Sequence, residues 1–253
     1  MIEVRNLSKA FGEKVILKDF SFTFERGKSN LIIGESGTGK SVLTKCMVGL
    51  VNPEEGEVLY DGQDFLKMNF DERKVIRQQI GMLFQGAALF DSMTVEENVM
   101  FPLSMFTEMP YEEKLERVLF CLKRVNLENV IKLYPAELSG GMKKRVAIAR
   151  AISLKPKYLF CDEPNSGLDP KTSILIDELI KEITEEYNIT TVVITHDMNS
   201  VLEIGDNIAF LHKGLKLWEG TKKEILRSTN KELSEFVYAT KFLKQFRDRL
   251  ENE

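Results

Sequence analysis

Apolar residues along the chain alternate with polar ones in some segments and run without a break in others. Alternation at residues 2–4 and 20–24 predicts strands that bury one face. Unbroken apolar runs at residues 31–33, 158–161 and 191–195 are typical of central strands in a parallel sheet that is covered on both faces. The pattern therefore predicts an α/β protein.

Shorter apolar segments predict further strands. Residues 58–60 form a run between turn-forming Pro53 and Gly62, and residues 80–84 form another that ends at Gln85. Residues 208–218 predict a hairpin or strand pair around Lys213-Gly214.

Helical spacing replaces the β-branched runs between about Val95 and Ile152. Five apolar residues in this region are expected to share one helix face: Leu115, Val118, Leu119, Leu122 and Val125. We expect a helical subdomain inserted into the α/β core. Further helices are predicted over residues 41–50, 174–186 and 231–250. The last is amphipathic, with these apolar residues: Leu233, Phe236, Val237, Phe242, Leu243 and Phe246.

Composition and charge narrow the class of protein. A chain of 253 residues with 43% hydrophobic and 29% charged residues is typical of a soluble globular protein with a large core. No apolar run approaches the roughly 20 residues of a membrane span, and the first residues lack the core of a signal peptide. The net charge of −4 offers no general basic field for nucleic acid. The short basic cluster Lys143-Lys144-Arg145 is interpreted as a solvated helix face.

The cysteines give no sign of metal or redox chemistry. Cys46, Cys121 and Cys161 lie in apolar patterns, and none belongs to a C-x-x-C pair. We expect buried, reduced thiols. His196 and His212 do not complete a metal-ligand pattern with them, so no zinc or iron site is expected.

The stretch that carries the most chemical information follows the run at residues 31–33. It fits G-x-x-x-x-G-K-[ST], the phosphate-binding loop, over Gly34, Glu35, Ser36, Gly37, Thr38, Gly39, Lys40 and Ser41. Its place between a predicted strand and helix favours this interpretation over a glycine-rich turn with a chance lysine. Backbone N–H groups and the helix N-terminus would hold a polyphosphate, Lys40 would reach its β- and γ-phosphates, and Ser41 would hold Mg²⁺.

Two carboxylates close the predicted strand at residues 158–161. Asp162 is placed to order Mg²⁺, and Glu163 is placed to act as a base on the water that attacks a γ-phosphate. Taken alone, the pair is weak evidence, because an acidic strand end can also cap the next turn.

A second anion-binding helix start is predicted at Leu138-Ser139-Gly140-Gly141-Met142. Ser139 can cap a helix over residues 143–153, and the two glycines leave backbone N–H groups open. In isolation an ordinary capped helix would be the preferred interpretation.

Together these motifs resemble the ATP-binding-cassette ATPase family, in which L-S-G-G is the signature motif. Gln85 matches the family's Q-loop glutamine, which contacts Mg²⁺ and the attacking water. Asp162 and Glu163 match the Walker B aspartate and the catalytic glutamate, and His196 matches the switch histidine at the γ-phosphate. Phe11 lies where an aromatic stacks on adenine, and residues 166–169 match the D-loop. Asn165 departs from the threonine of many relatives, with little consequence expected.

The resemblance covers roughly residues 1–225 and implies an architecture. It implies a P-loop NTPase with a RecA-like core, an antiparallel β-subdomain and an inserted helical subdomain, in one domain spanning residues 1–253. The core and β-subdomain take residues 1–94 and 155–225, the helical subdomain residues 95–154, and a C-terminal helical extension residues 226–253. ATP and Mg²⁺ are the implied cofactors. One copy of each motif implies a homodimer with two composite sites that combine the phosphate loop of one subunit with Ser139, Gly140 and Gly141 of the other.

Within the family, residues 82–103 and 135–145 resemble the Mla-type cassettes, in part through Met142, where other cassettes usually carry Gln. Those ATPases drive phospholipid trafficking between bacterial membranes with an integral membrane permease and an MCE-domain lipid-binding protein. The likeness implies the same partners here, no nucleic acid, and a peripheral place on the cytoplasmic face of the inner membrane.

Other functions stay open at this point. The chain could serve an amino acid or lipoprotein transporter, work as a soluble cassette in DNA repair or at the ribosome, or bind nucleotide without hydrolysis. Single motifs without coiled-coil insertions disfavour the repair and ribosomal classes, and the presence of Gln85, Glu163 and His196 disfavours a module without hydrolysis. Residues 86–106 are apolar with few charges, and some of Leu89, Phe90 and Met93 are expected to be exposed for a permease helix.

Overall fold

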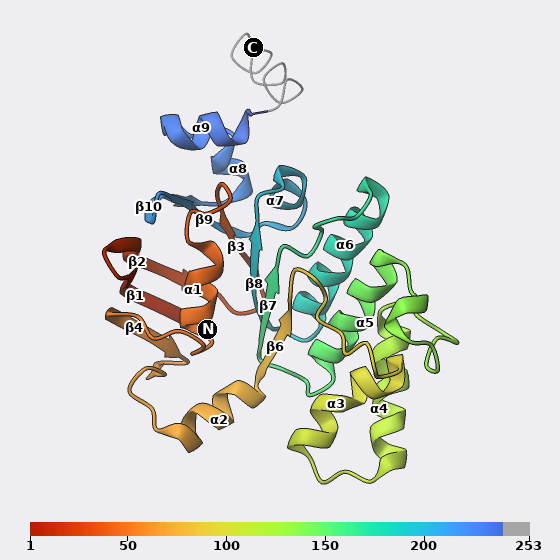
Figure 1. The fold of residues 1–253 in the computed structure, drawn as a ribbon. Coiled ribbons are helices and arrows are strands. Elements are labelled where there is room, and N and C mark those ends of the chain that lie inside the picture. The colour runs from red at the N-terminus through yellow and green to blue at the C-terminus, as the bar shows by residue number, and fades with distance from the viewer. Residues whose placement is uncertain (240–253) are drawn as a thin grey trace.

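The computed structural model describes residues 1–239 and contains two sheets with helices around the larger one (Figure 1). The smaller sheet is antiparallel, in the order β2-β1-β4-β5. Its strands are β1 (Ile2–Phe11), β2 (Lys14–Phe24), β4 (Glu55–Tyr60) and β5 (Gln63–Asp64). It supplies the antiparallel part that the resemblance implies.

The larger sheet has six strands in the order β10-β9-β3-β8-β7-β6. They are β3 (Ser29–Ile33), β6 (Ile80–Leu83), β7 (Tyr158–Asp162), β8 (Thr190–Thr195), β9 (Asn207–His212) and β10 (Leu215–Gly220). The pairs β9/β3, β3/β8, β8/β7 and β7/β6 are parallel, and β10 pairs antiparallel to β9. The three unbroken apolar runs are therefore central parallel strands, as predicted, and the terminal hairpin is confirmed.

The helices mostly match the predicted segments. They are α1 (Lys40–Met47), α2 (Phe70–Gln78), α3 (Val95–Phe106), α4 (Tyr111–Arg124), α5 (Gly140–Ile152), α6 (Pro170–Glu186), α7 (Met198–Ile204), α8 (Lys222–Ile225) and α9 (Lys231–Val237), with a 3-10 turn at Pro135–Glu137. The expectation for Leu119 is wrong: it is 46% exposed, while Val118 and Leu122 carry the buried face of α4.

Helices cover both faces of the six-stranded sheet. Side chains that alternate along β3 divide between two apolar clusters, with Leu31 and Ile33 in one and Ile32 in the other. The first cluster holds the inner faces of α3, α4, α5 and α6. The second holds α1 and the antiparallel sheet. Consequently α1 and α5 lie on opposite faces of the sheet (Figure 1).

The segment after β10 packs on the core as far as it is described. Ile225, Leu233 and Val237 are buried in the first cluster, and the ring of Phe236 lies 5.4 Å from that of Phe210. The predicted helix over residues 231–250 is present over Lys231–Val237, while Phe242, Leu243 and Phe246 lie outside the described residues. Among the described helices, none has the length and apolar character needed to cross a membrane.

Candidate nucleotide site

The residues singled out for chemistry meet at one edge of the parallel sheet. Gly34 follows β3, Gln85 follows β6 after one residue, Glu163 follows β7, and His196 follows β8. The strands are in register at these ends, where Ile33 lies beside Thr195 and Asp162 beside Ile194. The carboxyl edge of a parallel sheet is where α/β proteins place their ligands.

The loop between β3 and α1 needs glycine at two positions. Gly34 has φ +150°, and a Cβ there would come within 2.2 Å of the carbonyl oxygen of Leu211. Gly39 has φ +109°, and its Cβ would lie 2.9 Å from the carbonyl oxygen of Ile16. A side chain at either place would clash with fixed backbone, so the loop curls tightly only because both residues are glycine.

Lys40 begins α1 and points back into this loop. Its Nζ donates to the carbonyl oxygens of Gly34, at 2.7 Å, and Glu35, at 2.8 Å. Burial lowers the pKa of Lys40, while the carboxylates of Glu163, Asp162 and Glu35 oppose that shift. No side chain caps the N-terminus of α1, so its first N–H groups and the Lys40 ammonium form a ready site for an anion.

Ser41 and Asp162 place two oxygen ligands side by side. The Ser41 hydroxyl lies 3.5 Å from Oδ1 of Asp162. Burial raises the pKa of Asp162, which shows that the Lys40 and Lys45 ammonium groups do not fully balance its charge. Mg²⁺ prefers hard oxygen ligands and binds through one or two protein groups together with phosphate and water. The donor set therefore fits this ion.

Glu163 and His196 contact each other directly. Oε1 of Glu163 lies 2.8 Å from Nδ1 of His196. The backbone of Glu163 has φ +48°, a left-handed conformation that is uncommon for a residue other than glycine. The Glu163 N–H donates to the carbonyl oxygen of Ile194 at 2.9 Å, which holds this turn against the end of β8. Such local strain occurs where a side chain must take one particular direction.

Gln85 reaches toward the segment after Glu163. Its Nε2 donates to the hydroxyl of Ser166 at 3.4 Å. The side chain is exposed and joins the ends of β6 and β7. A metal-binding role for Gln85 stays a prediction, because its hydrogen bond is to Ser166.

Lys144 corrects the interpretation of the basic cluster as a solvated helix face. Its side chain is 4% exposed, and its Nζ donates to the carbonyl oxygens of Gln85 and, at 3.3 Å, of Glu163. Arg145 also points inward and donates to the carbonyl oxygens of Val125 and Asn126. Lys144 therefore ties together the two segments that carry the candidate catalytic side chains. In the sequence, only the position of Lys144 two residues after Met142, on the inner face of a helix, could have indicated this role.

The signature segment lies apart from the phosphate loop of the same chain. Ser139 caps α5 by accepting from the N–H of Met142 at 3.3 Å, as predicted. Gly141 packs so closely on α6 that a Cβ would lie 2.6 Å from the methyl of Thr172. Because α1 and α5 cover opposite faces of the sheet, the two helix starts do not form a single anion site in this chain.

Phe11 ends β1 with its ring 52% exposed. The ammonium of Lys9 lies 4.9 Å from the ring centroid. An exposed aromatic with a free face suits base stacking, which the resemblance implies for it.

The cysteines are buried, as expected. Burial raises the pKa of the Cys46 and Cys121 thiols to about 11, and that of Cys161 is raised as well. These thiols are therefore unreactive near neutral pH. Within residues 1–239 no three His, Cys, Asp or Glu side chains gather in a way that could hold a metal ion.

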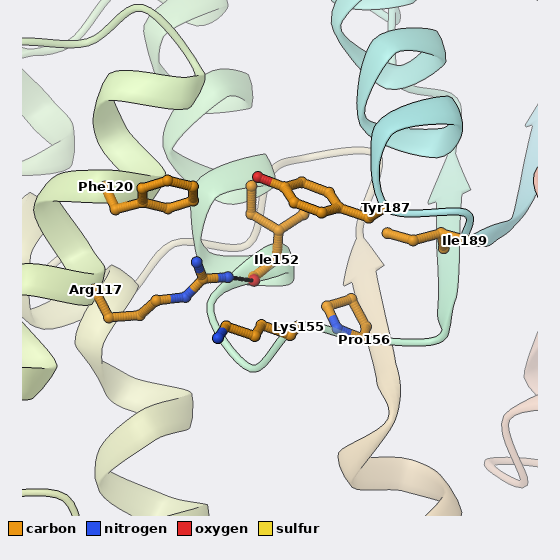
Figure 2. Close-up of a pocket in the computed structure, with 7 residues that line it drawn as sticks. All are labelled: Arg117, Phe120, Ile152, Lys155, Pro156, Tyr187 and Ile189. Atoms are coloured by element: carbon orange, nitrogen blue, oxygen red, sulfur yellow. Dashed lines mark hydrogen bonds between the residues drawn. The ribbon is translucent and has the colours of Figure 1, made fainter.

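A cavity of about 570 Å³ lies at the opposite edge of the sheet (Figure 2). Its walls come from Arg117, Phe120, Ile152, Lys155, Pro156, Tyr187 and Ile189. Arg117 donates to the carbonyl oxygens of Ile152 and Ser153. These contacts satisfy the C-terminal end of α5, and none of the candidate nucleotide residues lines this cavity.

Comparison with known proteins decides the family. The profile described as ABC transporter matches residues 17–166. The chain belongs to the ABC transporter family. It is an ATP-hydrolysing subunit of that family, and the expected P-loop ATPase fold is confirmed.

Two relatives of this ABC ATPase are named for different transport functions. The intermembrane phospholipid transport system ATP-binding protein MlaF of Haemophilus influenzae is 38% identical, over 94% of this chain and 90% of that protein. The methionine import ATP-binding protein MetN of Campylobacter jejuni is also 38% identical, over 96% of this chain and 77% of that protein. Sequence likeness therefore establishes ABC transport and leaves the substrate open.

A solved structure shares the fold and a nucleotide-bound state. It is the dimeric post-hydrolysis state of the ATP-binding cassette MJ0796 bound to ADP and phosphate, which is 36% identical with a TM-score of 0.80. The match covers 88% of this ABC ATPase and 99% of that chain.

Proposed function

We propose that two copies of this ABC ATPase bind and hydrolyse two ATP molecules at their shared interface and thereby drive phospholipid transport through an integral membrane permease. The chain would lie peripherally on the cytoplasmic face of the inner membrane and work with an MCE-domain lipid-binding protein. Nucleic acid has no part in this function.

The observation that carries the proposal is the separation of the two anion sites within one chain. The start of α1 has no side-chain cap, the start of α5 is capped by Ser139, and the two lie on opposite faces of the sheet. In a two-fold dimer the phosphate loop of each copy can face Ser139, Gly140 and Gly141 of the other. The dimeric state of the related MJ0796 cassette supports this arrangement.

The residues of the site divide the chemistry of hydrolysis. Lys40 and the N–H groups of residues 34–41 hold the phosphates, and Phe11 stacks on the base. Glu163 accepts a proton from the attacking water, and His196, 2.8 Å from Glu163, contacts the γ-phosphate. Gln85 orients the water from the end of β6. Ser41 and Asp162, together with Gln85, would hold Mg²⁺, and the ion would supply positive charge against the phosphate oxygens.

A groove beside Gln85 supports coupling to a permease. A cavity of about 420 Å³ lies between β6, α3 and the end of α5, and Phe84, Phe90, Phe101 and Phe106 are among its walls. Phe90 is 41% exposed, as expected, while Leu89 and Met93 are half-buried. Arg150 donates to the carbonyl oxygens of Ala87 and Ala88 and so holds this segment in place beside the groove. An apolar groove of this kind fits one face of an amphipathic helix.

The lipid assignment is supported by the MlaF relative and by the Mla-type residues at 82–103 and 135–145. Methionine import is the second candidate, because MetN and MlaF are both 38% identical to this chain.

Reconstitution separates these candidates. The chain would be purified with its permease from detergent-solubilised membranes and placed in vesicles that contain a fluorescent phospholipid or enclose labelled methionine. We expect ATP-dependent movement of the phospholipid, which Glu163→Gln abolishes. Movement of methionine without phospholipid would identify methionine as the substrate. Recovery of ribosomes or DNA in place of a permease would overturn the transport function.

A further inference from the structure

Asn165 links the D-loop to the helix that follows His196. Its side chain is 8% exposed, and its Nδ2 donates to the hydroxyl of Ser200 at 2.9 Å. Asn165 directly precedes the D-loop at residues 166–169, and the fully buried Ser200 lies on α7. The hydrogen bond therefore joins two segments that each border the candidate catalytic pair.

Asp177 lies in the same buried cluster. It projects from α6, is 3% exposed, and shares a cavity wall with Asn165. Among the described residues it forms no ion pair. Burial raises its pKa to about 6, and hydrogen bonding with Ser200 and Asn165 opposes that shift. The carboxylates of Asp197, which caps α7, and of Glu203 on α7 raise it further.

Two oxygens in this cluster lack a donor. Oδ1 of Asn165 and Oδ1 of Asp177 are both buried without a hydrogen-bond partner. An unpaired buried acceptor is costly. A proton on the Asp177 carboxyl would supply a hydrogen-bond donor to a cluster that holds two unpaired acceptor oxygens. Because Ser200 Oγ accepts from Asn165, its own O–H remains free to donate to Asp177.

We propose that Asp177 is a positioning residue whose protonated carboxyl, through Asn165 and Ser200, holds the D-loop against α7, and whose ionisation loosens that contact. Asp177 is buried on α6 and acts only through the segments that border Glu163 and His196. The inference rests on the proposed roles of those two residues in hydrolysis and not on the transported substrate.

The sign of the pH effect follows from the raised pKa. The folded chain binds this proton more tightly than the unfolded chain, whose aspartate keeps its ordinary value of 3.8. The contribution of this proton to the free energy of unfolding is therefore fully present below about pH 4 and is lost as the pH rises toward and through 6. For wild type relative to Asp177→Asn, which stays neutral, we expect the folding equilibrium constant to be about tenfold lower at pH 8 than at pH 5.

The test measures denaturant unfolding of the purified chain and ATP turnover of the chain with its permease, at several pH values from 5 to 8. The folding constant of the wild type divided by that of Asp177→Asn should fall with rising pH, and so should the corresponding ratio of kcat values. The KM for ATP should be the same in the two proteins. An unfolding ratio that does not change with pH overturns the proposal, whatever the transported substrate proves to be.

Two further variants guard against a purely structural explanation. Ser200→Ala removes the hydroxyl that accepts from Asn165, so it should destabilise the chain more at pH 5, where the contact is held, than at pH 8. Thr184→Val is the matched control, because Thr184 is a buried residue of α6, the helix of Asp177, and its hydroxyl bonds to Ile180 and Thr191. It should lose stability equally at both pH values and keep its kcat. A kcat loss in Thr184→Val that matches that of Ser200→Ala would contradict a positioning role.

Discussion

Glu163 combines an uncommon backbone conformation with a short contact to His196, and both features aim one carboxylate at the edge of the sheet. Replacing it by glutamine keeps the shape of the side chain and removes its ability to accept a proton. We expect ATP turnover to fall about 10²-fold or more while ATP binding survives.

Size-exclusion chromatography with ATP checks the second half of this expectation. Glu163→Gln should run as a dimer that ATP stabilises, because bound nucleotide is no longer consumed. Normal turnover in this variant would mean that Glu163 only caps its turn.

Lys144 acts at the residue scale without touching nucleotide. Lys144→Met keeps an unbranched side chain and leaves the carbonyl oxygens of Gln85 and Glu163 without their donor. We expect a lower kcat with little change in ATP affinity, measured by steady-state turnover and nucleotide titration. Lys143→Met is the control, since Lys143 is the half-buried neighbour on the same helix. An equal loss of kcat in the two variants would show that the contacts of Lys144 to Gln85 and Glu163 do not support turnover.

Sequence reasoning predicted local geometry that depends on one motif and missed contacts that depend on the fold. The placement of Lys40 in its loop and the Ser139 cap could be predicted because both depend on residues close by in the sequence. Lys144 could not, because its meaning depends on which face of α5 meets β6 and β7. Asn165 was expected to matter little, and its bond to Ser200 spans a separation of 35 residues that no local pattern encodes.

At the scale of elements, long apolar runs and turn residues placed the central strands correctly. Helix α2 was not predicted, because only Ile76 among its residues is buried and polar residues dominate its sequence. The capping box between Asn69 and Glu72 was the signal that could have found it. Helix α1 is shorter than the predicted segment, since Gly49 adopts φ +72° and ends the helical path.

The groove beside Gln85 gives a prediction at this scale. The ring centroids of Phe90 and Phe101 lie 4.8 Å apart, and Phe90 is still 41% exposed. Phe90→Asp puts a charge where we expect an apolar permease helix, so permease binding and transport should fail while the free chain keeps its basal ATP turnover.

Co-purification with the permease and vesicle transport are the two measurements for Phe90→Asp. Leu119→Asp is the control, because Leu119 is similarly exposed at 46% on α4 and does not line the groove. If Phe90→Asp recovers permease at wild-type yield and transports normally, the groove is not the contact.

At the scale of the whole molecule, the sheet separates the two helix starts that we propose to combine in a shared site. The start of α1 and the start of α5 cannot serve one nucleotide within this chain because they cover opposite faces. The resemblance implied the dimer from one copy of each motif. The packing gives the physical reason for it, which only the three-dimensional arrangement could show.

Mixing two inactive variants tests this central claim most directly. Lys40→Ala removes the ammonium at the phosphates, and Ser139→Arg places a bulky cation at the start of α5. Each homodimer should be inactive, since both of its composite sites are damaged. A heterodimer places both changes in one site and leaves the other intact, so an equal mixture should recover up to about a quarter of wild-type ATP turnover. Turnover that stays at the level of the separate variants, although the two chains associate, would contradict the shared site.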